Sequence, residues 1–119
     1  MATTSSITRE EMVGRAASLG PALKERAAEA EERRQMPEET VRDVVRAELL
    51  RVGTPPKYGG NGLDYDVSYD IAGEIGRACG STAWCASVWT SHNWVIGHWP
   101  KEAQDEYFAG GPDVLTSSA

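Results

Sequence analysis

Residues 76–99 read GRACGSTAWCASVWTSHNWVIGHW, and this stretch decides the fold of the chain. It contains all four tryptophans, both cysteines and both histidines of the sequence. From Ser81 onward its apolar residues lie on every side of a helix, a pattern typical of a buried helix. Such a helix must give the polar side chains of Ser91, His92 and Asn93 hydrogen-bond partners or a ligand. We therefore expect a buried helix that holds most of the residues suited to chemistry.

The sequence before this stretch has helical periodicity as well. Thr8 and Glu11 form a capping box, and an apolar stripe with a three- and four-residue repeat follows as far as Ala30. Gly20-Pro21 lies inside the stripe and predicts a kink or a restart of the helix. A second helix is expected from Pro37, with one shared inner side. That inner side consists of Val41, Val44, Val45 and Leu49.

Two further helices are expected around the tryptophan-rich stretch. One runs from Val67 to Cys79, and a short acidic helix from Lys101 to Phe108 follows Pro100. The sequence thus predicts an all-α fold with about five helices. Gly110-Gly111-Pro112 then ends the helical pattern, and the β-propensity of residues 114–116 predicts a strand. We expect a helical domain over residues 1–112 and the start of a truncated β-domain over residues 113–119.

One long break interrupts the helical pattern, at residues 54–62, TPPKYGGNG. The two prolines block a helix, and glycines adopt backbone angles that other residues avoid. Gly59, Gly60 and Gly62 are therefore interpreted as turn residues. They do not form a phosphate-binding loop, because no strand precedes them and no helix follows at the required step.

Composition and charge exclude several classes of protein. The 119 residues fit one domain, and a net charge of −6 argues against nucleic acid or an anionic membrane as the main partner. The N-terminus has no apolar signal core, and Ser91 to Asn93 interrupt the most apolar segment, so we expect a cytoplasmic protein without a membrane span. Cys79 and Cys85 lie about 240° apart around a helix, which predicts free thiols in a reducing compartment.

Two motifs carry a resemblance to a known family. Residues 55–63, PPKYGGNGL, resemble the Pro-x-x-Tyr-Gly-Gly-x-Gly loop in the N-terminal helical domain of acyl-CoA dehydrogenase-fold flavoproteins. Residues 76–84, GRACGSTAW, are similar to the branch that serves as the oxygenase component of two-component flavin-dependent aromatic monooxygenases. True acyl-CoA dehydrogenases usually lack this Ser-Thr-Ala-Trp turn and have Phe-Gly where this chain has His98-Trp99-Pro100. Glu48 departs from the family pattern, which usually has glycine at that corner.

The resemblance implies a function for a longer protein of which this chain is the N-terminal part. A central β-domain and a helical bundle that forms a homotetramer would follow the helical domain. The whole enzyme would take reduced FMN or FAD from a separate flavin reductase and hydroxylate a small aromatic substrate, such as a phenol, with O2. Most flavin contacts would lie in the later domains, so we expect this fragment alone to be inactive.

The resemblance also singles out residues of a site. Relatives that oxidise phenols place a histidine of this helix against the substrate hydroxyl, so His92 is the candidate catalytic and substrate-binding residue. An imidazole beside a phenol can help its proton to leave. Ser117 and Ser118 occupy positions where relatives carry a small hydroxyl residue near substrate and flavin. Both are candidate cofactor-binding residues, and Ser118 is also a candidate substrate-binding residue. The alternatives are a core histidine and ordinary strand serines.

The remaining aromatic and imidazole side chains have simpler interpretations. The tryptophans recur every five residues, about 140° apart around the helix, so they cannot form one stacking platform. Core packing is the default for each, and Trp84, in the Ala-Trp motif, is the candidate wall of the aromatic pocket. His98 lies near the helix end, where a partly positive side chain is favoured. The two histidines lack metal-ligand spacing, so no metal is expected.

The sequence leaves two rival functions open. The first is an acyl-CoA dehydrogenase that oxidises an acyl thioester with FAD, whose catalytic base would lie outside this chain. The second is a non-catalytic helical module that packs its apolar face against a partner or a second copy, the better interpretation if the chain is complete in the cell.

Overall fold

The computed structural model describes residues 7–117. Within this range the chain forms six α-helices and two short 3-10 helices, with no strand, which confirms the all-α prediction. The elements are α1 (Arg9–Ser18), α2 (Gly20–Arg33), α3 (Glu38–Arg46), η1 (Leu49–Arg51), η2 (Pro56–Tyr58), α4 (Val67–Ala78), α5 (Gly80–Ile96) and α6 (Lys101–Tyr107). The described helices include none that is long and apolar enough to cross a membrane.

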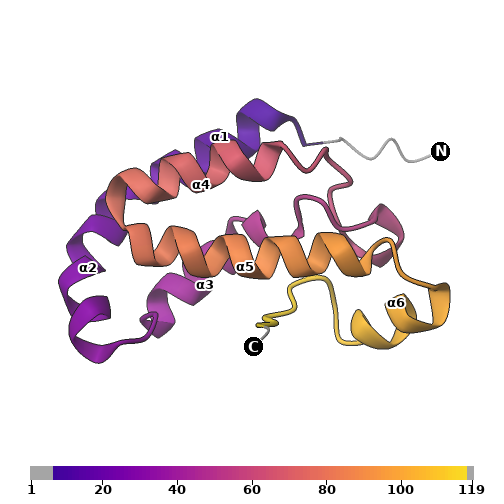
Figure 1. Ribbon diagram of the computed structural model, residues 1–119. Coiled ribbons are helices and arrows are strands. Elements are labelled where there is room, and N and C mark those ends of the chain that lie inside the picture. The colour runs from indigo at the N-terminus through magenta and orange to yellow at the C-terminus, as the bar shows by residue number, and fades with distance from the viewer. Residues whose placement is uncertain (1–6, 118–119) are drawn as a thin grey trace.

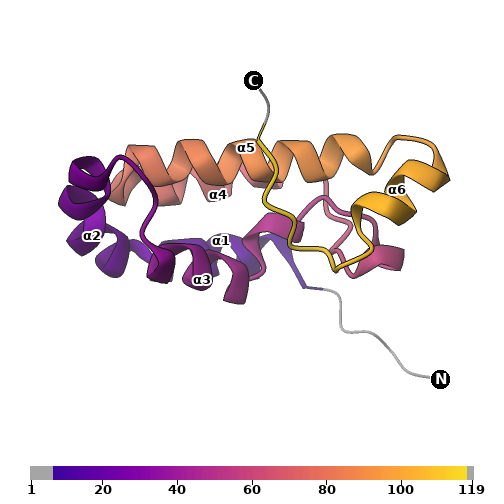
Figure 2. The ribbon, with the colours of Figure 1, turned by 90° about the horizontal axis from the view of Figure 1, so that it is seen from below.

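The helices pack in two layers, seen most clearly in Figure 2. Helices α4 and α5 lie side by side in one layer and run in opposite directions, joined at Cys79 (Figure 1). Helices α1, α2 and α3 form the other layer. The core fills the space between the layers, because each of these five helices turns its apolar side inward. Its buried members are Met12, Ala16, Leu23, Val44, Leu49, Leu50, Val52, Val67, Ile71, Ile75, Cys79 and Ala86.

The first helix begins and ends as the sequence predicts. The Thr8 amide donates to Glu11 Oε2 at 2.8 Å, and the Glu11 amide donates to Thr8 Oγ1 at 3.1 Å, which completes the capping box. Helix α1 ends at Ser18, and α2 starts at Gly20 with Pro21 in its first turn. The predicted restart at Gly20-Pro21 is therefore confirmed.

The corner after α3 differs from the expectation for Leu49. The prediction that Leu49 extends the inner side of this helix is wrong, because α3 ends at Arg46. Glu48 adopts a left-handed conformation with φ 63° and turns the chain, and Leu49 starts the 3-10 helix η1 while remaining buried. A non-glycine residue in this conformation costs about 1–2 kcal/mol. The corner thus keeps a glycine-like geometry although glutamate occupies it.

Helix α5 is buried on one side only, which corrects the expectation of burial all round. Its buried residues are Thr82, Ala86, Thr90, Asn93 and Ile96, a stripe with steps of three and four. The opposite side presents Trp84, 74% exposed, and Val95, 41% exposed. Among the described elements, α4, η1, α2 and α6 pack against α5. We call Trp84, Val88 and Val95 the outer face of α5, since they lie within about 40° of one another around the axis.

The chain after α6 crosses α5 near the middle of that helix (Figure 2). Residues 113–117 form no β-ladder, since the described part of the chain offers them no second strand. The strand expected from Val114 and the domain boundary after Pro112 therefore stay predictions.

Candidate functional site

His92 lies on α5 and is partly buried, and its ring is held by its own helix. The Nδ1 atom lies 2.6 Å from the carbonyl oxygen of Val88. A carbonyl can only accept, so Nδ1 carries a proton, and in the neutral ring Nε2 is left as an acceptor. His92 can therefore take a hydrogen bond or a proton at Nε2, which is the chemistry that a phenol hydroxyl requires of a general base.

The polar residues next to His92 differ in where their hydrogen-bond partners lie. Thr90 Oγ1 donates to the Ala86 carbonyl at 2.8 Å, and Ser91 Oγ donates to the Val88 carbonyl at 2.9 Å. These two hydroxyls are thus satisfied within α5 and need no ligand. The side chain of Asn93, in contrast, forms its hydrogen bonds with residues outside α5.

Asn93 is the residue whose importance the sequence interpretation missed. Its side chain is buried, and Nδ2 donates to the carbonyl oxygens of Leu50 and Val114, each at 3.2 Å. Its Oδ1 accepts the hydroxyl proton of Tyr107 at 2.7 Å. The sequence signal was the amide beside His92 in an otherwise apolar helix, but its partners are distant in the chain.

Trp84 and His92 are not brought together by this chain alone. They are eight residues apart on one helix, which separates them by about 12 Å along its axis. Trp84 is exposed at the beginning of the outer face, so nothing in the described residues closes a pocket between the two side chains. Its role as a pocket wall stays a prediction.

The two serines lie at and beyond the end of the described residues. Ser117 is exposed, and Ser118 lies outside the described range. An exposed hydroxyl at the end of a segment that crosses α5 fits the polar edge of a flavin as a hydrogen-bond donor. One such donor does not hold a whole cofactor, so the assignment of Ser117 and Ser118 to a flavin site stays a prediction.

The other aromatic residues on α5 pack at separate places, as their spacing predicts. The ring of Trp94 contacts Tyr65 and His98, each with a centroid distance of 4.6 Å. His98 Nδ1 lies 2.9 Å from the Trp94 carbonyl, so His98 binds an acceptor in the last turn of α5. Trp89 packs against the core.

The loop of residues 54–62 is fastened to α6 through Tyr58. The Tyr58 ring stacks on Phe108 with a centroid distance of 5.0 Å, and its hydroxyl donates to Asp105. This hydrogen bond, with burial as a smaller contribution, raises the pKa of Tyr58 to about 12. Lys101 and then Tyr58, through their hydrogen bonds, hold the pKa of Asp105 below its ordinary value. Tyr58 thus anchors the loop.

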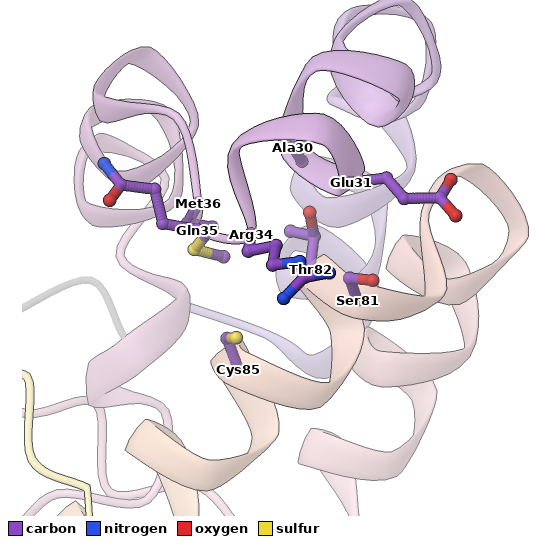
Figure 3. A pocket seen from close by; sticks show the side chains of 8 residues that line it. All are labelled: Ala30, Glu31, Arg34, Gln35, Met36, Ser81, Thr82 and Cys85. Carbon is purple, nitrogen blue, oxygen red and sulfur yellow. The ribbon is translucent and has the colours of Figure 1, made fainter.

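A pocket of about 310 Å³ opens between the end of α2 and the beginning of α5 (Figure 3). It is lined by Ala30, Glu31, Arg34, Gln35, Met36, Ser81, Thr82 and Cys85. The Arg34 side chain extends toward Thr82 in this view. None of the candidate site residues lines this pocket. Among the described residues, no group of three or more histidine, cysteine and acidic side chains could hold a metal ion.

Similarity to known proteins agrees with the helical architecture. The family model of the acyl-CoA dehydrogenase N-terminal domain matches residues 10–111. A pigment production hydroxylase from a Rhodococcus species is 39% identical over 111 residues, which cover 93% of this chain and 29% of that protein. The oxygenase component of an FADH2-dependent resorcinol hydroxylase from a Rhizobium species is 28% identical, over 87% of this chain and 25% of its own length.

A solved structure shows the same arrangement of helices. XiaF from a Streptomyces species, in complex with FADH2 and glycerol, superposes with a TM-score of 0.83 and 30% sequence identity. The match covers 90% of this chain and 27% of XiaF. The chain therefore spans less than a third of the length of the proteins it matches. By fold and by sequence, the chain belongs to the acyl-CoA dehydrogenase family and corresponds to its N-terminal domain.

Proposed function

We propose that this domain belongs to the oxygenase component of a two-component flavin-dependent monooxygenase, which hydroxylates a phenol or a related aromatic compound with O2. The observation that carries the proposal is the orientation of His92, whose Nδ1 is bonded to Val88 and whose Nε2 is left to accept a proton. A hydroxylase and a resorcinol hydroxylase oxygenase component among the relatives support the same chemistry.

The residues of this chain would act on the substrate rather than on oxygen. His92 would accept the phenol proton at Nε2, which leaves a phenolate whose ring carbons are more nucleophilic. Trp84 would form part of the aromatic wall, and Ser117 and Ser118 would donate hydrogen bonds to the substrate or to the flavin edge. A bound reduced flavin supplies the two electrons that allow one oxygen atom of O2 to enter the ring while the other leaves as water.

Several partners belong to the same proposal. A separate reductase would supply reduced FMN or FAD, and the whole protein would assemble as a homotetramer. The cytoplasm is the proposed compartment, because Cys79 and Cys85 are both free thiols, and a reducing environment maintains that state.

Two other functions have a specific observation in their favour. The family match itself favours an acyl-CoA dehydrogenase that oxidises a thioester with FAD. The exposed outer face of α5 favours a non-catalytic module that binds a partner through Trp84 and Val95. In neither function would His92 act as the base, because the base of the dehydrogenase would lie outside this chain and the module carries out no reaction.

The experiment compares two reactions of the whole protein. In the first, a flavin reductase, NADH, FMN or FAD, and resorcinol are supplied, and hydroxylated product is measured by mass spectrometry. In the second, reduction of an electron-accepting dye is followed with acyl-CoA substrates of several chain lengths. The proposal expects product in the first reaction only. Dye reduction without hydroxylation supports the dehydrogenase instead, and activity in neither reaction supports the non-catalytic module.

A further inference from the structure

The segment of residues 113–117 is held across α5 by a partly buried hydrogen-bond network around the buried side chain of Asn93. Asn93 is 1% exposed, and its two amide hydrogens are used by the carbonyl oxygens of Leu50 and Val114. Tyr107, on α6, bonds to the Asn93 oxygen and lies 2.8 Å from Thr116 Oγ1. We call Asn93, Tyr107 and Thr116 the Asn93 network.

The protons in this network can be placed by counting donors. Asn93 Oδ1 cannot donate, so Tyr107 must spend its one hydroxyl hydrogen on that oxygen. Thr116 then donates to the Tyr107 oxygen. Burial raises the pKa of Tyr107, and the bond to Thr116 opposes this rise, as a donor to the phenol oxygen does. The network therefore runs in one direction, from Thr116 through Tyr107 and Asn93 to the backbone of η1 and of the segment.

An ion pair fixes the beginning of the same segment. Arg51 Nε donates to Asp113 Oδ1 at 3.1 Å, and Arg51 also pairs with the other carboxylate oxygen. Both side chains are largely buried, with 23% and 19% of their surface exposed. A buried bidentate arginine–carboxylate pair fixes direction as well as distance. Three of the five residues 113–117 are thus tied to α5, α6 or η1.

We propose that Asn93 and Tyr107 are positioning residues for the hydroxylation reaction, because they fix the segment that carries Ser117 on the same turn of α5 that carries His92. This inference rests on the proposed function, since it concerns the placement of Ser117 relative to His92. Asn93 is the next residue after His92. Movement of the segment along α5 therefore changes the distance between the side chains of Ser117 and His92. Neither Asn93 nor Tyr107 needs to touch the substrate.

The first test measures the segment directly and requires no activity. Tyr107→Phe and Thr116→Val each remove one hydroxyl from the whole protein with little change of shape. Tyr69→Phe is the matched control, because Tyr69 is an exposed tyrosine on α4, outside the network. Hydrogen exchange followed by mass spectrometry, without flavin or substrate, should become about fivefold to tenfold faster in the peptide over 113–117 for both network variants. The double variant should exchange no faster than Tyr107→Phe, because both substitutions break one connected chain.

The second test measures how the reaction is coupled. In the network variants, the fraction of reduced flavin whose oxidation yields hydroxylated phenol should fall at least about threefold, with a matching rise in hydrogen peroxide. The dissociation constant of the phenol should change less than twofold, and Tyr69→Phe should retain wild-type coupling.

The outcomes separate this inference from the proposed function. A hydrogen-exchange rate that stays unchanged in residues 113–117 of Tyr107→Phe overturns the inference. An increase in exchange rate that is equal throughout the chain also overturns it, because the substitution then does not act on this segment in particular. Faster local exchange with wild-type coupling also overturns it, because the segment then moves without affecting the reaction. A wild-type protein that hydroxylates no phenol overturns the proposed function, and the positioning role with it. Faster exchange confined to residues 113–117, together with weaker coupling of flavin oxidation to hydroxylation, supports the inference.

Discussion

Gly60 offers a strict test of the loop geometry, because an added methyl group there would collide with backbone. A Cβ atom on Gly60 would lie 2.0 Å from the Thr54 carbonyl oxygen and 2.4 Å from its carbon. Contacts of real Cβ atoms are essentially never shorter than 3.0 Å, so the Gly60→Ala variant must move the two backbones apart. A shift of this size breaks the hydrogen bonds that close the loop.

The magnitude follows from those hydrogen bonds. The amides of Asn61, Gly62 and Leu63 donate to the carbonyls of Arg51, Thr54 and Val52 at 2.9, 3.0 and 2.9 Å. At about 1 kcal/mol for each bond, Gly60→Ala should destabilise the loop by about 3 kcal/mol. This corresponds to an increase of about 100-fold in the hydrogen-exchange rate of the Asn61 and Leu63 amides.

The assay is hydrogen exchange on the whole protein, resolved for the peptide that contains residues 60–63. Gly73→Ala is the control, because Gly73 lies in α4 and an added Cβ meets nothing within 4 Å. This control should leave the loop unchanged and stabilise α4 by about 0.5–1 kcal/mol. Exchange at Asn61 and Leu63 within threefold of wild type in Gly60→Ala would refute the geometric argument.

Three further predictions follow from single residues. The His92→Gln variant of the whole protein should hydroxylate about 10²–10⁴-fold more slowly. Its residual activity should rise as the pH approaches the pKa of the phenol, about 10. A loss of less than threefold would exclude His92 as the base. In a spectrophotometric titration, Tyr58 should ionise at about pH 12, and Tyr58→Phe should remove that transition. Since the folded pKa is raised, the Tyr58–Asp105 bond stabilises the fold below about pH 10 and is lost as pH rises through about 12; ionisation of Tyr58 near 10 would contradict its hydrogen bond. Glu48→Gly should raise the thermal midpoint through a gain of about 0.5–1 kcal/mol, because glycine removes the left-handed strain at φ 63° at some entropic cost. A lower midpoint would show that glutamate is not strained there.

The sequence predicted the elements well because their signals are local. A capping box, the Gly20-Pro21 restart and four-residue apolar steps each act within one or two helical turns. The corner at Glu48 was harder, since a strained conformation at a non-glycine residue has no local signature. The covered side of α5 was harder still, because all its sides are apolar and the packing of other elements, chiefly α4 and η1, determines which side is buried.

The site was predictable only in part, for a related reason. His92 is a candidate from the sequence because it is an imidazole in an apolar helix. Which of its ring nitrogens can accept a proton depends on the hydrogen bond with the Val88 carbonyl, which the sequence does not reveal. Asn93 binds the backbone of Leu50 and Val114, and a carbonyl acceptor carries no sequence signal. None of the described residues closes a pocket over Trp84, so its role as a pocket wall stays a prediction.

Hydroxylation of a phenol by O2 is the reaction that we propose for the whole protein. The most direct measurement supplies the whole protein with reduced flavin, resorcinol and ¹⁸O2, and determines the mass of the product. We expect a product that carries one ¹⁸O atom, formed by the wild type and in much smaller amount by His92→Gln. Complete oxidation of the flavin with hydrogen peroxide as the only oxygen product, for every phenol supplied, would contradict it.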